Sequence, residues 1–372
     1  KGFFASRGIE KPNLMILLDL VALGTTCDIV PLTGLNRAFV FGGLSRMREQ
    51  ANIGLRALTS VAQIDGDVMF KDLGYAIGPR INAGSRMYNS RMGFEILSTN
   101  DREQASSHAF LLDRCNDERK AVEKTMVDQA LAMVEDMDLA QKPVIILKHP
   151  EWHDGVRGLV ASKIKERFGR PAIAFNISSA EGENIIWGGS GRSVEGIDLG
   201  HCFRLAEEHG LAKGGGHAMA AGLTVSDNKM AELVVFLERA ISEQAAQISS
   251  APRASVSGIL TVRAAASREF FWQMEQGGPY GRDNPAPAFW LKDIRVIAAK
   301  IVSDRHVFAD ISDWEGGARL RLKLWNGVDT LSGKALLKAR GNPGLSVIGS
   351  LELNRFKGRE SVEMLVHYVC EE

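Results

Sequence analysis

The chain has 372 residues, of which 45% are hydrophobic, and its 45 Lys and Arg residues balance its 45 Asp and Glu residues. This composition excludes a disordered tail, a collagen-like fibre and a small disulfide scaffold. At about 100–200 residues per domain, we expect two or three domains. No apolar run reaches the roughly 18 residues that a membrane helix needs, so we expect no membrane partner.

Two further features concern the setting of the chain. Its cysteines are sparse and none lies in a CxxC pair: Cys27, Cys115, Cys202 and Cys370. This pattern favours a reduced, cytoplasmic protein. The sequence opens with Lys1 rather than Met, and we therefore expect a piece of a longer protein.

The first part of the chain is typical of helices. Helices are predicted over 13–32, ended by Pro31, and over 35–58, where apolar residues recur on one face. The segment GPRINAGSRM at 78–87 is rich in glycine and is predicted to be a loop. Residues 101–137 form a long, charged amphipathic pattern, which predicts a helix connecting two domains.

The periodicity then changes to alternating strands and helices, which indicates an α/β domain. Strands are predicted at 143–149, 171–177, 184–192 and 220–225, and helices at 156–169, 198–209 and 229–247. A Ser/Pro/Ala linker is predicted at 248–254. Beyond it, many short strands with polar turns over about 120 residues predict a small closed β-barrel.

The first candidate for chemistry is Asp28, which follows an apolar helix and lies beside small residues. A carboxylate at the edge of a buried element is costly unless it is paired or bound to a metal. From spacing alone a helix cap or an ion pair is the favoured explanation, because one carboxylate does not make a metal site.

Two glycine-rich segments, GGSGRS and KGGGHAMAAG, are candidates for anion binding. Consecutive glycines allow close approach of a ligand, and their N–H groups can form an anion nest. The alternative is a pair of tight turns. The candidate residues are Ser190, Arg192, Gly214, Gly215, Gly216 and His217.

Three further candidates are isolated side chains. His153 stands before a predicted helix, whose first N–H groups favour anions, although its neighbour Asp154 could merely cap that helix. Arg80 and Arg86 lie in the predicted glycine-rich loop and could grip phosphates, or could tie the loop in place.

The barrel region combines basic residues with aromatic rings. In the segment ARLRLKLW, strict alternation places Arg319, Arg321 and Lys323 on one face of one strand. Single-stranded nucleic acid sites combine such a basic track with stacking rings. The alternative is that the rings belong to the core and the charges to a solvated face.

Taken in order, these motifs resemble RecJ, a family of single-stranded-DNA-specific 5′→3′ exonucleases within the DHH phosphoesterase superfamily. The resemblance spans essentially the whole chain. It is carried by DLVALGTTCDIVPL, GPRINAGSRM, EWHDGVRGLVASKIKERFGRPAIAF, GSGRS, GGGHAMAAG and GPYGRDNPAPAF.

The resemblance implies an α/β multidomain protein in three parts. Residues 1–100 would be the end of a DHH catalytic domain, 101–250 the connecting helix with a DHHA1 domain, and 251–372 an OB-fold barrel. It implies that Asp28 is a metal ligand, and that Arg192 and Gly214–His217 contact the substrate. The Asp-His-His triplet is absent, so the remaining ligands of the implied two-metal site are expected upstream of this chain.

The function implied is Mn²⁺- or Mg²⁺-dependent hydrolysis of phosphodiester bonds in single-stranded DNA, in recombination and repair. This chain alone is expected to be incomplete for catalysis. Implied partners are single-stranded DNA, a single-stranded DNA-binding protein and a RecQ-type helicase. Two alternatives stay open, a non-catalytic module that binds single-stranded DNA and a phosphodiesterase that acts on short oligonucleotides.

Overall fold

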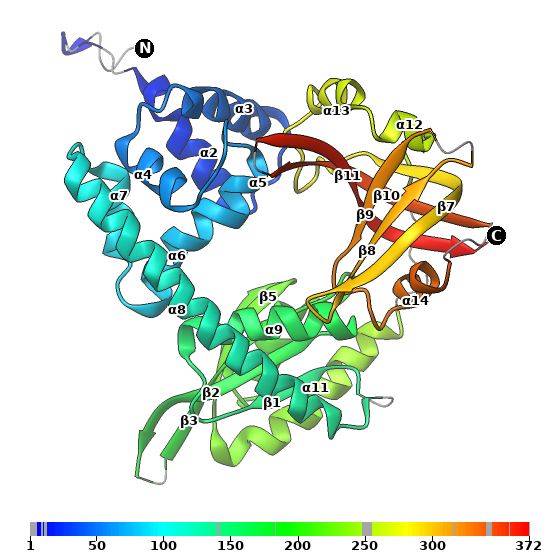
Figure 1. The fold of residues 1–372 in the computed structure, drawn as a ribbon. Coiled ribbons are helices and arrows are strands. Elements are labelled where there is room, and N and C mark those ends of the chain that lie inside the picture. Colours follow the sequence, from blue (N-terminus) through cyan, green and yellow to red (C-terminus); the bar gives the residue numbers. More distant parts are fainter. Residues whose placement is uncertain are drawn as a thin grey trace. The chain divides into compact units, whose positions relative to one another are not determined.

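The chain forms two compact units in a computed structural model (Figure 1). The first unit combines residues 1–78 with residues 253–372, and the second contains residues 79–252. The structure describes residues 6–8, 10, 13–139, 142–182, 184–247, 255–314, 317–339, 344–356 and 358–371.

The first unit begins with short helices. They are the 3₁₀-helix η1 (Leu14–Leu17), α2 (Leu18–Cys27), α3 (Gly34–Arg48), α4 (Ile53–Val61), α5 (Phe70–Asp72) and the π-helix η2 (Leu73–Ile77). The helix predicted over 35–58 is two helices, because the chain turns at Gln50, which has a φ of 51°. Asn52 then starts α4 by accepting a hydrogen bond from the Leu55 N–H at 2.9 Å, as N-cap residues do.

The rest of the first unit is a β-sheet closed on itself. Its strands are β6 (Gly258–Ile259), β7 (Ala288–Val302), β8 (His306–Ser312), β9 (Arg319–Leu324), β10 (Leu345–Phe356) and β11 (Arg359–Glu371). They pair in the order β10-β11-β9-β8-β7-β6, and β10 also pairs with β7, so β7, β8, β9, β11 and β10 form a ring. The predicted barrel is confirmed. Three short helices were missed, α12 (Val262–Ala265), α13 (Arg268–Glu275) and α14 (Leu331–Lys338).

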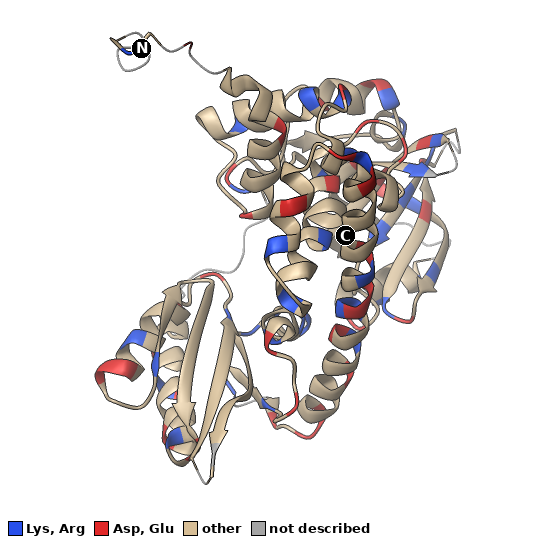
Figure 2. Cartoon of the chain, turned by 90° about the vertical axis from the view of Figure 1, so that its left-hand side faces the viewer, with Lys and Arg blue, Asp and Glu red and all other residues tan. Residues whose placement is uncertain are grey.

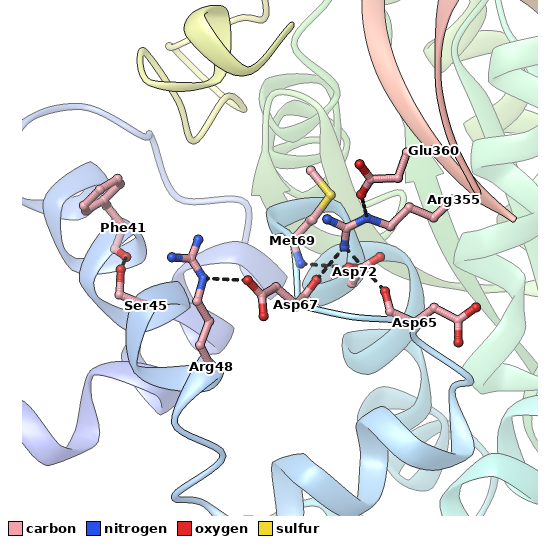
Figure 3. A network of polar contacts seen from close by, with 9 residues as sticks. All are labelled: Phe41, Ser45, Arg48, Asp65, Asp67, Met69, Asp72, Arg355 and Glu360. Atoms are coloured by element: carbon pink, nitrogen blue, oxygen red, sulfur yellow. Dashed lines mark hydrogen bonds and ion pairs between the residues drawn. The ribbon is translucent and has the colours of Figure 1, made fainter. Parts of the chain in front are cut away.

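Backbone carbonyls join the helices of the first unit to its barrel. Leu32 donates its N–H to the Arg282 carbonyl at 2.7 Å. Lys71 reaches the Leu353 carbonyl at 2.7 Å. The guanidinium of Arg355, at the end of β10, donates to the carbonyls of Asp65 and Asp67 (Figure 3). Residues far apart in sequence therefore form one compact body.

The second unit is an α/β sandwich preceded by helices. The helices are α6 (Gly78–Met87), α7 (Arg91–Ser98), α8 (Arg102–Glu135), α9 (Asp154–Phe168), α10 (Leu199–Glu208), the 3₁₀-helix η4 (Asp227–Lys229) and α11 (Met230–Ala245). The strands are β1 (Ile145–Lys148), β2 (Ala172–Glu181), β3 (Asn184–Arg192), β4 (Lys213–His217) and β5 (Ala220–Ser226). The sheet order is β1-β2-β3-β5-β4.

Each face of this sheet is covered by its own helices. Residues of α8 and α9 share one buried cluster with Ile145, Leu147 and Ala174. Residues of α10 and α11 share another with Phe175 and Leu223 on the opposite face. The alternation of strands and helices read from the sequence is thus confirmed, and so is the long helix, here α8.

The prediction of a loop at 78–87 is wrong, because this segment is α6. Its proline, Pro79, lies where the π-helix η2 passes directly into α6, so its missing N–H falls at a change of helical hydrogen bonding. Glycine and asparagine content suggested a loop, but tertiary packing overrides these weak propensities. Gly84, for example, lies so close to Leu112 of α8 that a Cβ would come within 2.9 Å of its Cδ2.

The second glycine-rich segment is also not a turn, because Lys213–His217 is the edge strand β4. It pairs with β5, with Gly215 opposite Gly222. An extended strand does not make the nest conformation that the sequence suggested. Glycine serves packing instead: a Cβ on Gly214 would lie 2.6 Å from the Cβ of Leu223.

Two predictions about organisation are not tested by the structure. The linker at 248–254 lies outside the described residues. The division into three domains at residues 100 and 250 stays a prediction, since compactness groups residues 1–78 with the barrel. Among the residues that are described, no helix is long and apolar enough to cross a membrane.

Substitution of Gly189 in β3 tests whether these glycines serve packing. A Cβ there would lie 2.5 Å from Phe175 and 2.8 Å from Leu223. We expect Gly189→Ala to lower the free energy of unfolding by about 1–3 kcal/mol, because the core must shift to admit the methyl group. Gly222→Ala on the neighbouring strand is the control, since its Cβ meets only the Gly189 carbonyl oxygen at 3.6 Å. Equal urea midpoints for the two variants would contradict this assignment.

Candidate nucleic-acid interface

Asp28 lies at the C-terminal end of α2 with its side chain exposed. Its N–H donates to the Gly24 carbonyl at 3.0 Å, which fixes the backbone there. Neighbouring Cys27 is half-buried, and burial, followed by the charge of Asp28, raises the pKa of its thiol.

The described residues do not complete a metal site around Asp28. In the part of the chain that the structure describes, no three His, Cys, Asp or Glu side chains gather so that they could hold a metal ion. A divalent metal ion in a protein is bound by several ligands, so a single carboxylate does not form a metal site. Asp28 is thus available as one ligand but does not form a centre by itself.

Two arginines of the second unit converge on one side of α9. Arg86, in the last turn of α6, donates from Nη1 to the Gly155 carbonyl at 2.7 Å. Arg192 ends β3, and a Cβ placed on Gly158 would lie 2.8 Å from its Nη2. Gly155 and Gly158 are three residues apart, so they lie on one face of α9. A Cβ on Gly155 would likewise lie 2.3 Å from the Arg86 carbonyl oxygen. Both arginines therefore pack against the face of α9 that carries Gly155 and Gly158.

The electrostatics of this pair favour an anion. Burial lowers the pKa of Arg86, and the charge of Arg119 lowers it further, against an opposing effect of Glu123. Burial also lowers the pKa of Arg192, followed by the charge of Arg86. Both guanidiniums remain charged at neutral pH. Within the described residues no ion pair joins either one to a carboxylate, so a phosphate or carboxylate of a ligand would relieve their repulsion.

His153 and Ser190 lie in a polar network beside these arginines. His153, rather than Asp154, caps α9, because its Nδ1 accepts the Gly155 N–H at 3.1 Å. The Ser190 hydroxyl accepts a hydrogen bond from Arg157 Nε at 3.3 Å. Arg157 also pairs with Asp154 at 2.7 Å and donates to the side-chain Oδ1 of Asn176. This network holds the start of α9 on the sheet.

Other predicted residues of the second unit lie elsewhere or are already paired. Arg80 forms an ion pair with Asp113 of α8 at 2.8 Å, with only 14% of its side chain exposed. Gly214, Gly215 and Gly216 lie on the edge strand with an exposed His217 at its end. Side chains of α10 contact this strand, since Arg204 donates to the Gly216 carbonyl and Glu207 accepts the Gly214 N–H, each at 3.3 Å.

The basic strand β9 of the barrel is largely neutralised. Arg321 pairs with Asp310 at 2.8 Å, and Lys323 pairs with Glu352 at 3.0 Å and contacts Glu363. In the described part of the barrel, no ion pair involves Arg319. In the view of Figure 2, basic and acidic residues are likewise interspersed.

Aromatic rings flank the basic strand. Trp325 is 48% exposed, and its ring packs edge-on against His306 at 4.6 Å and Phe308 at 5.5 Å between centroids. Lys323 Nζ lies 6.0 Å from the centre of the Phe308 ring. The three basic residues share one face, as predicted, while Leu320, Leu322 and Leu324 fill the core.

Sequence reasoning missed the residues that shape the arginine site. Gly155 and Gly158 were read only as part of a motif, and Arg157 and Asn176 were not considered. The available signal was DGVRG at the start of the helix predicted over 156–169, since glycine is unfavourable in helices. Two of them at a spacing of three indicate a surface that something approaches closely.

Two family models match the chain. One, for the DHHA1 domain, matches residues 141–243, and the other, for the RecJ OB domain, matches residues 260–368. The first covers the sheet of the second unit with α9, α10 and most of α11, and the second covers β7 to β10, most of β11 and the helices α12, α13 and α14.

Similar proteins include the single-stranded-DNA-specific exonucleases RecJ of Dickeya dadantii and Escherichia coli. The first is 36% identical, with 99% of this chain and 63% of the relative aligned. The second is 34% identical, with 98% and 63% aligned. This chain thus spans about 63% of the length of these relatives.

Solved structures agree. The RecJ of Thermus thermophilus in complex with Mg²⁺ matches with a TM-score of 0.77 at 26% identity, over 99% of this chain and 54% of that one. Its complex with Mn²⁺ matches with a TM-score of 0.76 at 27% identity, over 99% and 51%. With both domain models matched in order and with relatives above 30% identity along almost its whole length, this chain belongs to the RecJ family.

Proposed function

We propose that the protein to which this chain belongs is a single-stranded-DNA-specific 5′→3′ exonuclease, and that this chain binds the DNA strand. The observation that supports this most directly is the Arg86 and Arg192 pair, two half-buried cations without a carboxylate partner among the described residues. A DNA phosphate would supply the negative charge that pairs with these two cations. The relatives are named single-stranded-DNA-specific exonucleases.

We propose Mn²⁺ or Mg²⁺ as the metal, because the solved relatives contain these ions. When bound, such ions activate water and neutralise charge at a scissile phosphate. The exposed carboxylate of Asp28 would provide one ligand. The described residues do not complete the site, so we assign hydrolysis to this carboxylate together with groups outside them.

The barrel would bind the strand beyond the arginine site. Trp325 offers a half-exposed ring beside Phe308, and stacking on such rings tolerates any base. Arg319 adds a cation, whereas Arg321 and Lys323 would have to exchange carboxylates for phosphates. Such exchange returns little net energy, so we infer that stacking dominates here.

Cellular context is part of the same proposal. We propose action in the cytoplasm, supported by the four free cysteines, of which Cys27 and Cys370 are partly exposed. Recombination and repair, with a single-stranded DNA-binding protein and a RecQ-type helicase as partners, would follow from the proposed activity.

The first experiment follows bound and degraded label together, with this chain, 5′-labelled single-stranded DNA and Mn²⁺, against an EDTA control. We expect binding without degradation, because the described residues present a single candidate ligand. In a family member that degrades DNA, the change equivalent to Asp28→Asn should abolish turnover and spare binding. Metal-dependent degradation by this chain would contradict the assignment.

Substitution of Arg192 tests the arginine site. Arg192→Gln should weaken binding of single-stranded DNA and reduce the slope of log K against log salt by about 0.7, since one phosphate contact is lost. Arg80→Gln is the matched control, because Arg80 is held by Asp113. A fluorescence anisotropy titration at several salt concentrations measures both. If the two variants have the same slope as the parent, the arginine pair does not bind phosphate.

The barrel gives a second matched pair. Arg319→Gln should weaken DNA binding more than Arg321→Gln, because Arg321 already pairs with Asp310 at 2.8 Å. Trp325→Ala should weaken it most, by roughly 1–3 kcal/mol if one base stacks on the ring. The same titration measures all three. The reverse order, with Arg321→Gln the most damaging, would mean that the ion pair opens when DNA binds.

A further inference from the structure

A cavity of about 490 Å³ lies within the first unit, between α2, α4 and the residues 63–68 that follow α4. It does not include Asp28. Its floor is apolar and buried, formed by Leu55, Ile77 and Met47. Its rim is polar and exposed, and carries Asp65 and Asp67. This volume falls in the range of small-ligand sites.

A buried carboxylate lines this cavity. Asp19, in the first turn of α2, is only 3% exposed. One of its oxygens accepts the N–H of the next residue, Leu20, at 2.8 Å. No described cation forms an ion pair with it. The start of a helix offers it partial stabilisation, but a buried carboxylate without a counter-ion is unfavourable.

The described cations that line the cavity do not form an ion pair with Asp19. Arg48 pairs with Asp67 at 3.2 Å, and its side chain is 58% exposed at the rim (Figure 3). Arg56 lines the cavity as well but forms no ion pair with Asp19. The described residues also gather no three ligands for a metal ion.

The rim of the cavity is joined to the barrel by hydrogen bonds. Arg355 donates to the carbonyls of Asp65 and Asp67 and is itself held by Glu360 at 3.0 Å. In Figure 3 the Asp65 carboxylate points away from this guanidinium. The rim loop is therefore tied to the barrel, and the carboxylate of Asp65, which forms no ion pair among the described residues, attracts a cation toward the mouth.

We propose that this cavity receives one arginine or lysine side chain from a polypeptide segment outside this chain. A guanidinium or ammonium group would reach Asp19, and its methylene stem would pack on the apolar floor, as long basic side chains do. A hydrated inorganic cation fits this lining less well, because the lining includes the apolar side chains of Met47, Leu55 and Ile77. This site is independent of the proposed exonuclease activity.

The test uses agmatine, a guanidinium on a four-carbon stem, and a blocked peptide with one arginine among glycines. Methyl NMR signals of Met47 and Ile77 report occupancy. We expect both probes to shift these signals, the peptide at lower concentration, and Asp19→Asn to weaken both by about tenfold. Glu49→Gln is the matched control, because Glu49 pairs with Arg46 and does not line the cavity.

A second variant guards against misfolding of Asp19→Asn. Ala51→Trp fills the mouth without altering a charge and should abolish both responses. Unmoved methyl signals in the parent would overturn the proposal. Binding of agmatine but not of the peptide would replace the polypeptide by a free amine. Binding that appears only in Arg56→Gln would show that this chain's own Arg56 occupies the carboxylate.

Discussion

The packing of α9 in the second unit depends on two glycines, Gly155 and Gly158, which lie on one face of the helix. At Gly155 the backbone of α6 comes so close that a methyl group would overlap its carbonyl, and at Gly158 the same is true of a guanidinium. Glycine weakens a helix by roughly 1 kcal/mol relative to alanine, so the helix accepts a cost at each position. In return two arginines are held near each other and partly out of water. Their mutual repulsion and their partial burial are unfavourable, and the anion binding proposed above would reduce both costs.

The sequence predicts the layers of the molecule well because they follow from periodicity. The long helix α8, the strands and helices between residues 145 and 245, and the closed β-barrel all arise from regular patterns of burial. Predictions based on composition failed where packing decides. The α6 segment resembles a loop by its glycines, and β4 resembles a nest, yet Gly84 and Gly214 are explained by their close neighbours Leu112 and Leu223.

The candidate site was predictable only in part, for a related reason. Arg86, Arg192, Ser190 and His153 can be chosen as polar residues in suggestive motifs. Which arginines stay without a carboxylate cannot be read from the sequence, because partners such as Asp113 and Asp310 lie 33 and 11 residues away from Arg80 and Arg321. Pairing across such distances depends on the tertiary fold. The cavity around Asp19 could not be predicted from the sequence for the same reason, since its lining residues come from several helices.

The joint between the helices and the barrel of the first unit is made chiefly to backbone carbonyls. Leu32, Arg37, Lys71 and Arg355 each donate to a carbonyl oxygen across this joint. Every residue type carries such an oxygen, and none of these acceptors can titrate. The accepting loops are therefore free to change their side chains during evolution while the joint persists. The same joint keeps its acceptors over the whole pH range in which the protein is folded.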